Sequence, residues 1–320
     1  MPFSKNDIKI DPAKETDRIV QQLRQYARNY RKQGAVIGIS GGIDSSVCLA
    51  LSAKAFGSKK VFALTMPEAD SNPESAVLAR KLAKQFGVEY IVEDLTAPLA
   101  GFGTYRRRDE AMKTVFPEYD ATYKSKIVLP TALDDKDTLS IYQLTIISPE
   151  GEEKTARIPL MEYLQIVAAS NFKQRSRMSM LYYHADRLNY IVIGTGNKNE
   201  HEQGFFVKHG DGGADIKPIA HLFKTHVYQL AAYLNIPKEI QQRTPTTDTY
   251  SAECTQEEFF FRVPHEIGDV VWYGMEKSVA VNELAQALDI SEEKVVHIQN
   301  DIQRKIKTTE YLKANPAHIE

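Results

Sequence analysis

A short apolar run followed by a loop rich in glycine and serine constrains this chain more than any other stretch. Residues 35–39 (Ala-Val-Ile-Gly-Ile) are typical of a strand buried on both faces, as in parallel sheets. Residues 47–56 predict a helix that ends at Gly57. Between them lies Ser-Gly-Gly-Ile-Asp-Ser-Ser at 40–46. Glycine lets the backbone approach an anion closely, and the free N–H groups of a helix start point at it, so this stretch predicts a phosphate-binding loop.

An aspartate within this loop suggests a bound cation. The loop lacks the lysine of the pattern G-x-x-x-x-G-K-S/T, so it is a different phosphate site from the Walker loop. Asp44 would repel a phosphate unless a cation lay between them, and carboxylate and phosphate oxygens together are suitable ligands for Mg²⁺. The alternative is a structural glycine turn in which Asp44 or Ser45 caps the helix. The complete string S-G-G-x-D-S favours a nucleotide loop.

Composition excludes several classes of protein. The 320 residues are 42% hydrophobic and 26% charged, as in ordinary globular proteins, and a net charge of −2 gives no general attraction for nucleic acid. No apolar run approaches the roughly 20 residues that span a bilayer, and the N-terminus lacks a signal-peptide core. Cys48 and Cys254 are the only cysteines, too few for a disulfide framework or a cysteine-based zinc site. We therefore expect a cytoplasmic protein without a membrane or nucleic-acid partner.

The order of apolar and amphipathic segments predicts an α/β fold with an open parallel sheet flanked by helices. Further buried strands are expected at 60–65, 88–92 and 189–194, with helices between them, and ligands of such sheets bind at the carboxyl ends of the strands. Residues 98–160 interrupt this rhythm with a predicted β-hairpin, and the arginines at 106–108 are expected to form a solvated face. We expect one domain over residues 1–274 with an insertion at about 117–158. A helical C-terminal extension over 275–320 would pack on that domain.

Several motifs in order are similar to the NAD synthetase family, of the ammonia-dependent type. They are S-G-G-x-D-S at 40–45, R-x-R-M at 175–178, G-T-x-x-x-x-E at 194–200, F-F-x-K-x-G-D-G-G-A-D at 205–215, a lysine nine residues later and P-T at 245–246. Motifs in the right order and spacing are far more specific than any one of them. The match covers residues 10 to 250, apart from 117–158. The resemblance implies the Rossmann-like fold of the adenine nucleotide alpha hydrolases, in the superfamily of N-type ATP pyrophosphatases.

The resemblance also implies roles for individual residues. Asp44 and Glu200 would hold Mg²⁺, and Asp44 and Lys224 would be catalytic. Three residues would contact the deamido-NAD substrate, namely Arg175, Lys208 and Asp215. The residues that would surround ATP are Gly38, Ile39, Ser40, Gly41, Gly42, Ile43, Asp44, Ser45, Thr195, Lys224 and Thr246.

Each of these residues also has a structural interpretation. Arg175 and Lys208 could be ordinary surface pairs, and Glu200 could form a salt bridge at a helix start. Lys224 could lie in the first turn of a helix, where the helix dipole disfavours its charge. The histidines do not predict a metal site, although two could line the nucleotide site, namely His201 and His209.

The function implied is ATP-dependent amidation of deamido-NAD to NAD through an acyl-adenylate, with ammonia consumed and AMP and pyrophosphate released. About 30 residues precede the ATP loop, too few for an appended glutaminase, so ammonia would be free or supplied by a separate glutaminase. Family analogy implies a homodimer. Segments 117–158, 247–259 and 304–305 depart from the family pattern on the acceptor side. Two alternatives therefore stay open, an adenylating amide ligase for another carboxylic acid and a non-catalytic nucleotide-binding protein.

Overall fold

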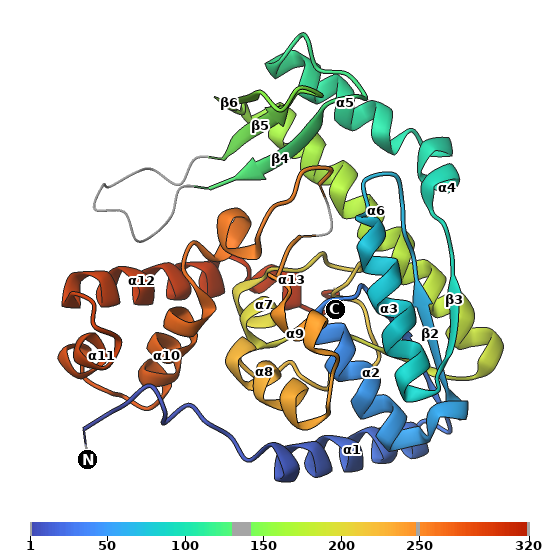
Figure 1. Ribbon diagram of the computed structural model, residues 1–320, viewed down its shortest axis with the longest axis vertical. Coiled ribbons are helices and arrows are strands. Elements are labelled where there is room, and N and C mark those ends of the chain that lie inside the picture. Colours follow the sequence, from blue (N-terminus) through green and yellow to red (C-terminus); the bar gives the residue numbers. More distant parts are fainter. Residues whose placement is uncertain (1, 130–141, 248–249, 319–320) are drawn as a thin grey trace.

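The centre of the protein is a four-stranded parallel sheet. The computed structural model describes residues 2–129, 142–247 and 250–318. The strands are β1 (Ala35–Gly38), β2 (Val61–Thr65), β3 (Glu89–Val92) and β7 (Ile191–Ile193), in the order β3-β2-β1-β7. Ile37 of β1 pairs with Ala63 of β2 on one side and with Ile193 of β7 on the other. The predicted open parallel α/β sheet is therefore confirmed (Figure 1).

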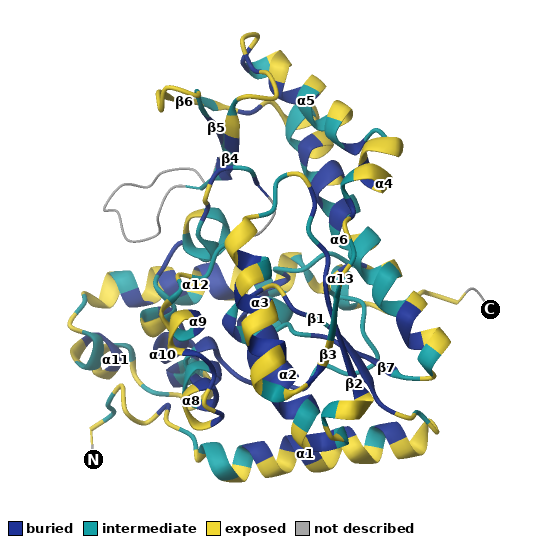
Figure 2. Cartoon of the chain, turned by 45° about the vertical axis from the view of Figure 1, so that its right-hand side comes forward, coloured by how far each residue is buried: buried dark blue, intermediate teal, exposed yellow. Residues whose placement is uncertain are grey.

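Helices cover both faces of this sheet. Alternate strand residues point to opposite faces, and both sets are apolar and buried. Ile37 and Ala63 face a core shared with α1 (Pro12–Asn29), α2 (Ile43–Phe56), α3 (Pro73–Phe86) and α8 (Lys224–Tyr233). Val36 and Phe62 face the other core, which includes residues of α4 (Thr96–Gly101) and α6 (Leu160–Leu188). Figure 2 shows the buried residues concentrated on the strands and on the helix faces turned toward them.

The strand order places two loops side by side at one edge of the sheet. From β1 the chain continues to β2 and β3 on one side, and it returns much later as β7 on the other side of β1. The loops after β1 and β7 therefore flank a topological switch point, which is where open α/β sheets bind their ligands. These loops contain the residues at 40–45 and 195–200 that the sequence analysis singled out.

A second sheet lies apart from the first, at the top of Figure 1. It consists of β4 (Lys124–Val128), β5 (Gln143–Ile147) and β6 (Glu153–Arg157) in antiparallel order, next to α5 (Thr104–Val115). Its core contains Met112, Ile127, Leu144 and Ile146. The predicted hairpin is confirmed as β5–β6, and β4 was not predicted because Lys-Ser-Lys-Ile-Val offers only a short alternating pattern.

One expectation for this region was wrong. Arg108 is largely buried, with its guanidinium paired to Asp70 and at 2.8 Å from Asp109, whereas Arg106 and Arg107 are exposed as predicted. Asp70 also pairs at 2.5 Å with the buried Lys173 of α6. Arg108 therefore helps to attach α5 to α6 and does not belong to a solvated face.

The chain ends in a helical region with its own core. This region contains α10 (His265–Glu276), α11 (Val281–Leu288), α12 (Glu292–Thr308) and the short α13 (Glu310–Lys313). Trp272, Leu284 and Val295 pack together there, and Phe223 next to α8 joins them. The remaining short elements are η1 (Ser58–Lys60), α7 (Lys198–Gln203), α9 (Lys238–Gln242) and η2 (Glu257–Phe261).

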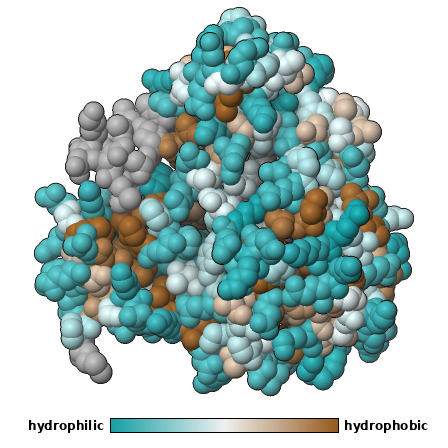
Figure 3. Space-filling model, in the orientation of Figure 1, coloured by the Kyte–Doolittle hydropathy of each residue, from teal (hydrophilic) through white to brown (hydrophobic). Residues whose placement is uncertain are grey.

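The surface seen in Figure 3 is mostly hydrophilic, with hydrophobic residues in separate patches, one of them toward the left over the C-terminal helices. Among the described residues, no helix has both the length and the apolar character that a bilayer crossing requires.

Candidate active site

A cleft of about 510 Å³ opens at the carboxyl ends of β1 and β7. Its walls come from the loop after β1, the loop after β7, one face of α6, residues 243–247 and 250–260, and α13. Nine predicted ATP or metal residues line it, namely Ser40, Gly42, Ile43, Asp44, Ser45, Thr195, Glu200, Lys224 and Thr246. The sheet topology thus brings together residues that are as far apart in the chain as Ser40 and Thr246.

The loop after β1 has the tight conformation that its glycines permit. Gly41 has φ +74°, and a Cβ there would lie 2.7 Å from the Ser75 carbonyl oxygen, so another residue would be strained and crowded. Gly42 is the N-cap of α2 and makes no side-chain cap, which means that neither Asp44 nor Ser45 caps the helix. The hydroxyls of Ser45 and Ser46 instead donate to the Gly42 carbonyl oxygen, at 3.0 and 2.7 Å. The carboxylate of Asp44 is therefore available for other partners.

Asp44 meets a lysine and an asparagine inside the cleft. Lys224 Nζ lies 2.5 Å from Asp44 Oδ2, and Asn197 Nδ2 donates to Asp44 Oδ1 at 2.9 Å. The Lys224 side chain is 5% exposed. Burial alone would lower the pKa of Lys224, but the charge of Asp44 and then that of Glu200 raise it above the ordinary value. Lys224 is the first residue of α8, as the structural interpretation expected, yet its ammonium group contacts Asp44 at the end of the loop after β1.

Glu200 lies next to Asp44 through the same asparagine. Asn197 and Glu200 form a capping box at the start of α7, in which Glu200 Oε2 accepts from the Asn197 backbone N–H at 3.0 Å. Gln256 Nε2 donates to the other oxygen, Oε1, at 3.1 Å. Burial, followed by the negative charge of Asp44, raises the pKa of Glu200 to about 8. Asn197 thus holds two carboxyl groups that repel each other, and a divalent cation bound between them would reduce this repulsion.

The three residues predicted to contact the acceptor are bonded to other parts of the fold. Arg175 Nε donates to the Lys208 carbonyl oxygen at 3.2 Å. Lys208 Nζ donates to the carbonyl oxygens of Tyr311 and Ala314, at 3.1 and 2.9 Å. Asp215 accepts hydrogen bonds from the backbone N–H of Val192 and from the hydroxyl of Tyr182. They are outside the described lining of the cleft, as are four further predicted residues, Gly38, Ile39, Gly41 and His201, and also His209.

Sequence reasoning missed several residues that line the cleft. Gln256 carries no signal in the sequence. Asn197, which lines the smaller adjoining cavity and bonds to Asp44, could have been found from its capping-box spacing to Glu200. Aromatic side chains of the second sheet and its surroundings were also missed, because only tertiary contacts bring them to the cleft. They are Tyr142, Tyr163, Tyr250 and Phe259.

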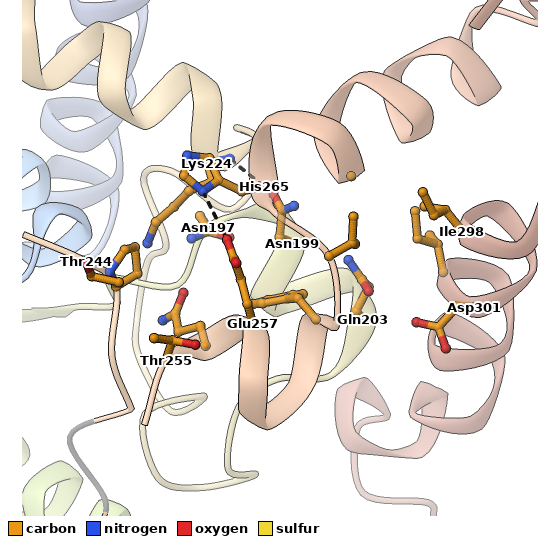
Figure 4. Close-up of a pocket in the computed structure, with 16 residues that line it drawn as sticks. Asn197, Asn199, Gln203, Lys224, Thr244, Thr255, Glu257, His265, Ile298 and Asp301 are labelled. Carbon is orange, nitrogen blue, oxygen red and sulfur yellow. Dashed lines mark hydrogen bonds and ion pairs between the residues drawn. The ribbon is translucent and has the colours of Figure 1, made fainter. Parts of the chain in front are cut away.

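A smaller cavity of about 40 Å³ adjoins the cleft behind Lys224. Figure 4 shows Lys224, Asn197 and Thr244 toward one end, and Ile298 and Asp301 of α12 at the other. Nearby, Glu257, His265 and Glu266 offer ligand atoms within 4.8 Å of one another, but Glu266 is exposed. The imidazole of His265 stacks on Tyr228 of α8.

Known proteins with similar sequences belong to one family. The family model for NAD synthase matches residues 15–127 and 150–315. The chain is 49% identical over 318 residues to an NH(3)-dependent NAD(+) synthetase from Rhizobium meliloti, which covers 99% of this chain and 95% of the relative.

Two solved structures have a similar fold. An NMN synthetase from Francisella tularensis aligns with a TM-score of 0.62 at 23% identity, covering 97% of this chain and 99% of that one. An NH3-dependent NAD synthetase from Campylobacter jejuni, in complex with the nitrate ion, aligns with a TM-score of 0.61 at 23% identity, covering 97% and 100%. These likenesses concern the fold, and the sequence matches identify the family. The resemblance in the motifs is therefore confirmed, and the chain belongs to the NAD synthase family.

Proposed function

We propose that this protein is a ligase that amidates deamido-NAD to NAD, with ATP and ammonia as the other substrates. The observation that carries the proposal is the convergence of Asp44, Glu200 and Lys224 on the loop after β1, inside one cleft. Acidic side chains beside a phosphate loop suit a metal-bound triphosphate, and a buried ammonium group suits its leaving pyrophosphate.

The residues of this site fit a magnesium ion. Asp44 and Glu200 supply hard carboxylate oxygens, and Asn197 holds both groups in place. The raised pKa of Glu200 reflects burial and then the repulsion of Asp44, and both effects favour a cation at this position. When bound, Mg²⁺ would neutralise charge on the triphosphate. Asp44 and Glu200 are thus the residues that would hold it.

The chain's own groups would act mainly by positioning and electrostatics. The substrate carboxylate attacks the α-phosphorus of ATP, which gives an acyl-adenylate and pyrophosphate. Lys224 Nζ and the N–H groups at the start of α2 stabilise the negative charge of the departing pyrophosphate. Ammonia then attacks the acyl carbon, which yields the amide and AMP. This sequence needs no protein nucleophile, because holding the reactants together supplies much of the acceleration.

Neither cysteine suits the role of a glutaminase nucleophile. Cys48 and Cys254 are both buried. Burial raises the pKa of Cys48 well above its ordinary value, and it raises the pKa of Cys254 to about 11, so neither thiol would ionise readily. Ammonia is therefore taken from solution or from a separate glutaminase, and the two sources are separated by assaying the purified protein with ammonium and with glutamine.

We extend the proposal to assembly and location. Large apolar side chains are exposed near the start of α6, namely Leu160, Met161 and Leu164, and they favour a homodimer. Light scattering on the purified protein tests this. The chain forms one domain over residues 1–274, with the insertion at about 117–158 and with residues 275–320 packed on it. We expect it to work in the cytoplasm without membrane or nucleic-acid partners.

The decisive experiment incubates the purified protein with ATP, Mg²⁺, ammonium and deamido-NAD. Equal amounts of NAD, AMP and pyrophosphate are expected. Release of ADP in place of AMP would contradict the proposed chemistry. AMP formation only with another acid, such as nicotinate mononucleotide, would favour a related amide ligase. Nucleotide binding without pyrophosphate release would leave a non-catalytic binding protein.

A further inference from the structure

The second sheet is joined to the wall of the cleft by main-chain hydrogen bonds. The backbone N–H of Ala252 donates to the Ser125 carbonyl oxygen at 3.1 Å, and that of Leu129 donates to the Glu258 carbonyl oxygen at 2.9 Å. The backbone N–H of Ser125 donates to the Ser251 hydroxyl at 2.9 Å. Strand β4 thus supports the segment that carries Tyr250 and several other residues of the cleft. The sheet is therefore positioned to contribute to the binding of substrates.

A tyrosine next to the second sheet lines the cleft and stacks on a tyrosine of α6. The rings of Tyr142, just before β5, and Tyr163 have centroids 4.4 Å apart and planes inclined by 19°. Both are partly buried and both line the cleft. Tyr250 and Phe259 line the same region and contact each other edge to face at 5.5 Å. Aromatic residues are thus frequent in this wall, although they form only 9% of the chain.

The polarity of the cleft changes along α6. The residues of α6 that line it are Tyr163, Val167, Ser170, Asn171 and Gln174, which share one helix face. They extend over about 16 Å at the rise of an α-helix. The aromatic and apolar members come first, and the polar ones lie toward the second half of α6, whose residues pack with Val36 of β1 and Val192 of β7. A nucleotide has the same polarity, with a planar base at one end and phosphates at the other.

We propose that the Tyr142–Tyr163 pair is a stacking platform for the heteroaromatic ring of a nucleotide substrate, and that the second sheet contributes a specificity residue, Tyr142, to this site. The proposal deepens the proposed function and rests on it for the identity of the nucleotides. Residues 128–149 lie outside the match to the family model, so this part of the site is not among the positions that the family model describes. Stacking of a base on an aromatic side chain is worth enough to change affinity about tenfold or more.

The test measures dissociation constants by calorimetry for ATP with Mg²⁺ and, separately, for deamido-NAD. Tyr142→Ala is expected to raise the dissociation constant of one of these nucleotides about tenfold or more and to change that of the other less than twofold. If ATP is affected, the ring is its adenine; if deamido-NAD is affected, the ring belongs to the acceptor. Tyr142→Phe, which keeps the ring, is expected to stay within twofold of the unaltered protein. Tyr142→Leu, which keeps apolar bulk without a ring, should behave like Tyr142→Ala.

Two controls separate stacking from a general disturbance of the cleft. Inorganic tripolyphosphate with Mg²⁺ has no ring, so its affinity should not change in Tyr142→Ala. Tyr30→Ala alters another close tyrosine pair, with Tyr26 on α1, outside the lining of the cleft, and it should change no dissociation constant. The proposal is overturned if the dissociation constants of both nucleotides stay within twofold of the unaltered protein in Tyr142→Ala and Tyr142→Leu. Equal weakening of both nucleotides and tripolyphosphate, or a loss in Tyr142→Phe as large as in Tyr142→Ala, would overturn it too.

These measurements are independent of turnover. A protein that binds a nucleotide through Tyr142 but makes no NAD would retain the stacking platform and disprove the proposed function. If the protein makes NAD and Tyr142→Ala leaves both dissociation constants unchanged, the proposed function stands and the stacking platform is disproved.

Discussion

The two ends of the proposed reaction site are built in different ways. At the predicted ATP end, Lys224 pairs with Asp44, and Asn197 links Asp44 to Glu200 by hydrogen bonds. Burial and then the charge of Asp44 raise the pKa of Glu200, so the two carboxyl groups are only partly balanced by Lys224. At the end predicted to bind the acceptor, Lys208 Nζ donates to the carbonyl oxygens of Tyr311 and Ala314, so its charge is already hydrogen-bonded within the fold. The ATP end is thus preorganised for a ligand, whereas the acceptor end serves the fold as well as any substrate. Substitutions at the two ends should therefore differ in size and in kind.

The largest effect is expected for Asp44→Asn. The amide keeps the shape but removes the charge that would hold Mg²⁺, so pyrophosphate release should fall by about 100-fold or more. A phosphate-release assay coupled to pyrophosphatase measures this. Asp17→Asn on the exposed side of α1 is the matched control and should keep full activity. Comparable rates in the Asp44 variant and the control would show that Asp44 has no metal role.

Lys224→Gln should come next, with a loss in kcat of roughly 100-fold. The removed ammonium group is the buried cation next to Asp44, and it would act where pyrophosphate leaves. Lys224→Arg keeps the charge and should recover part of the loss. The kinetic parameters distinguish a catalytic role from a binding role. A rise in the KM for ATP with unchanged kcat would assign Lys224 to binding alone.

Lys208→Ala should have a smaller effect, of a different kind. We expect the KM for deamido-NAD to rise by less than about tenfold while the dissociation constant of ATP stays unchanged, because the side chain holds α13 rather than the ATP loop. Hydrogen exchange over residues 309–314 should increase at the same time. A loss of activity as large as that of Asp44→Asn would remove the contrast between the two ends.

The charge repulsion at the ATP end predicts a pH-dependent stability. The folded pKa of Glu200, about 8, lies above its ordinary value because of burial and then the charge of Asp44. A raised carboxyl pKa contributes stability that is complete below the unfolded pKa and is lost as pH rises toward 8. Without metal, Glu200→Gln should therefore unfold at a temperature higher than the unaltered protein by about 2 °C or more at pH 8.5, with little difference at pH 4.5.

Thermal unfolding in EDTA at both pH values measures this difference. The same variant should be inactive, since it loses a carboxylate that would hold Mg²⁺. A difference in unfolding temperature that does not change with pH would contradict the raised pKa of Glu200.

The smallest effect is expected at the thiols. Cys254→Ala should reduce activity less than twofold, and brief treatment with iodoacetamide should not inactivate the native enzyme, because both thiols are buried and their pKa values are raised. Rapid inactivation that substrate prevents would instead place a reactive cysteine at one end of the site.

The features that could be predicted were those that local sequence determines. Asn72 and Pro73 predicted the start of α3, and Asn72 Oδ1 does accept from the Glu74 backbone N–H at 2.9 Å. The loop at 40–45 and the strands around it followed from apolar runs and glycines. Asn197 was overlooked, although a capping-box spacing precedes Glu200. Tyr142 and Gln256 could not be predicted, since tertiary contacts bring them to the cleft. Gln256 lies in a segment that is hydrogen-bonded to β4, more than one hundred residues earlier, and Tyr142 precedes β5, which pairs with β4.

The engagement of Lys208 by α13 has a consequence for how the protein matures. Tyr311 and Leu312 line the cleft, so the side on which we propose that the acceptor binds is completed only after translation has passed these residues. A nascent chain arrested before α13 could have a finished Rossmann-like core and a finished ATP loop, and yet lack one wall of its pocket. Ribosome-bound intermediates should then capture ATP well before they can hold the second nucleotide.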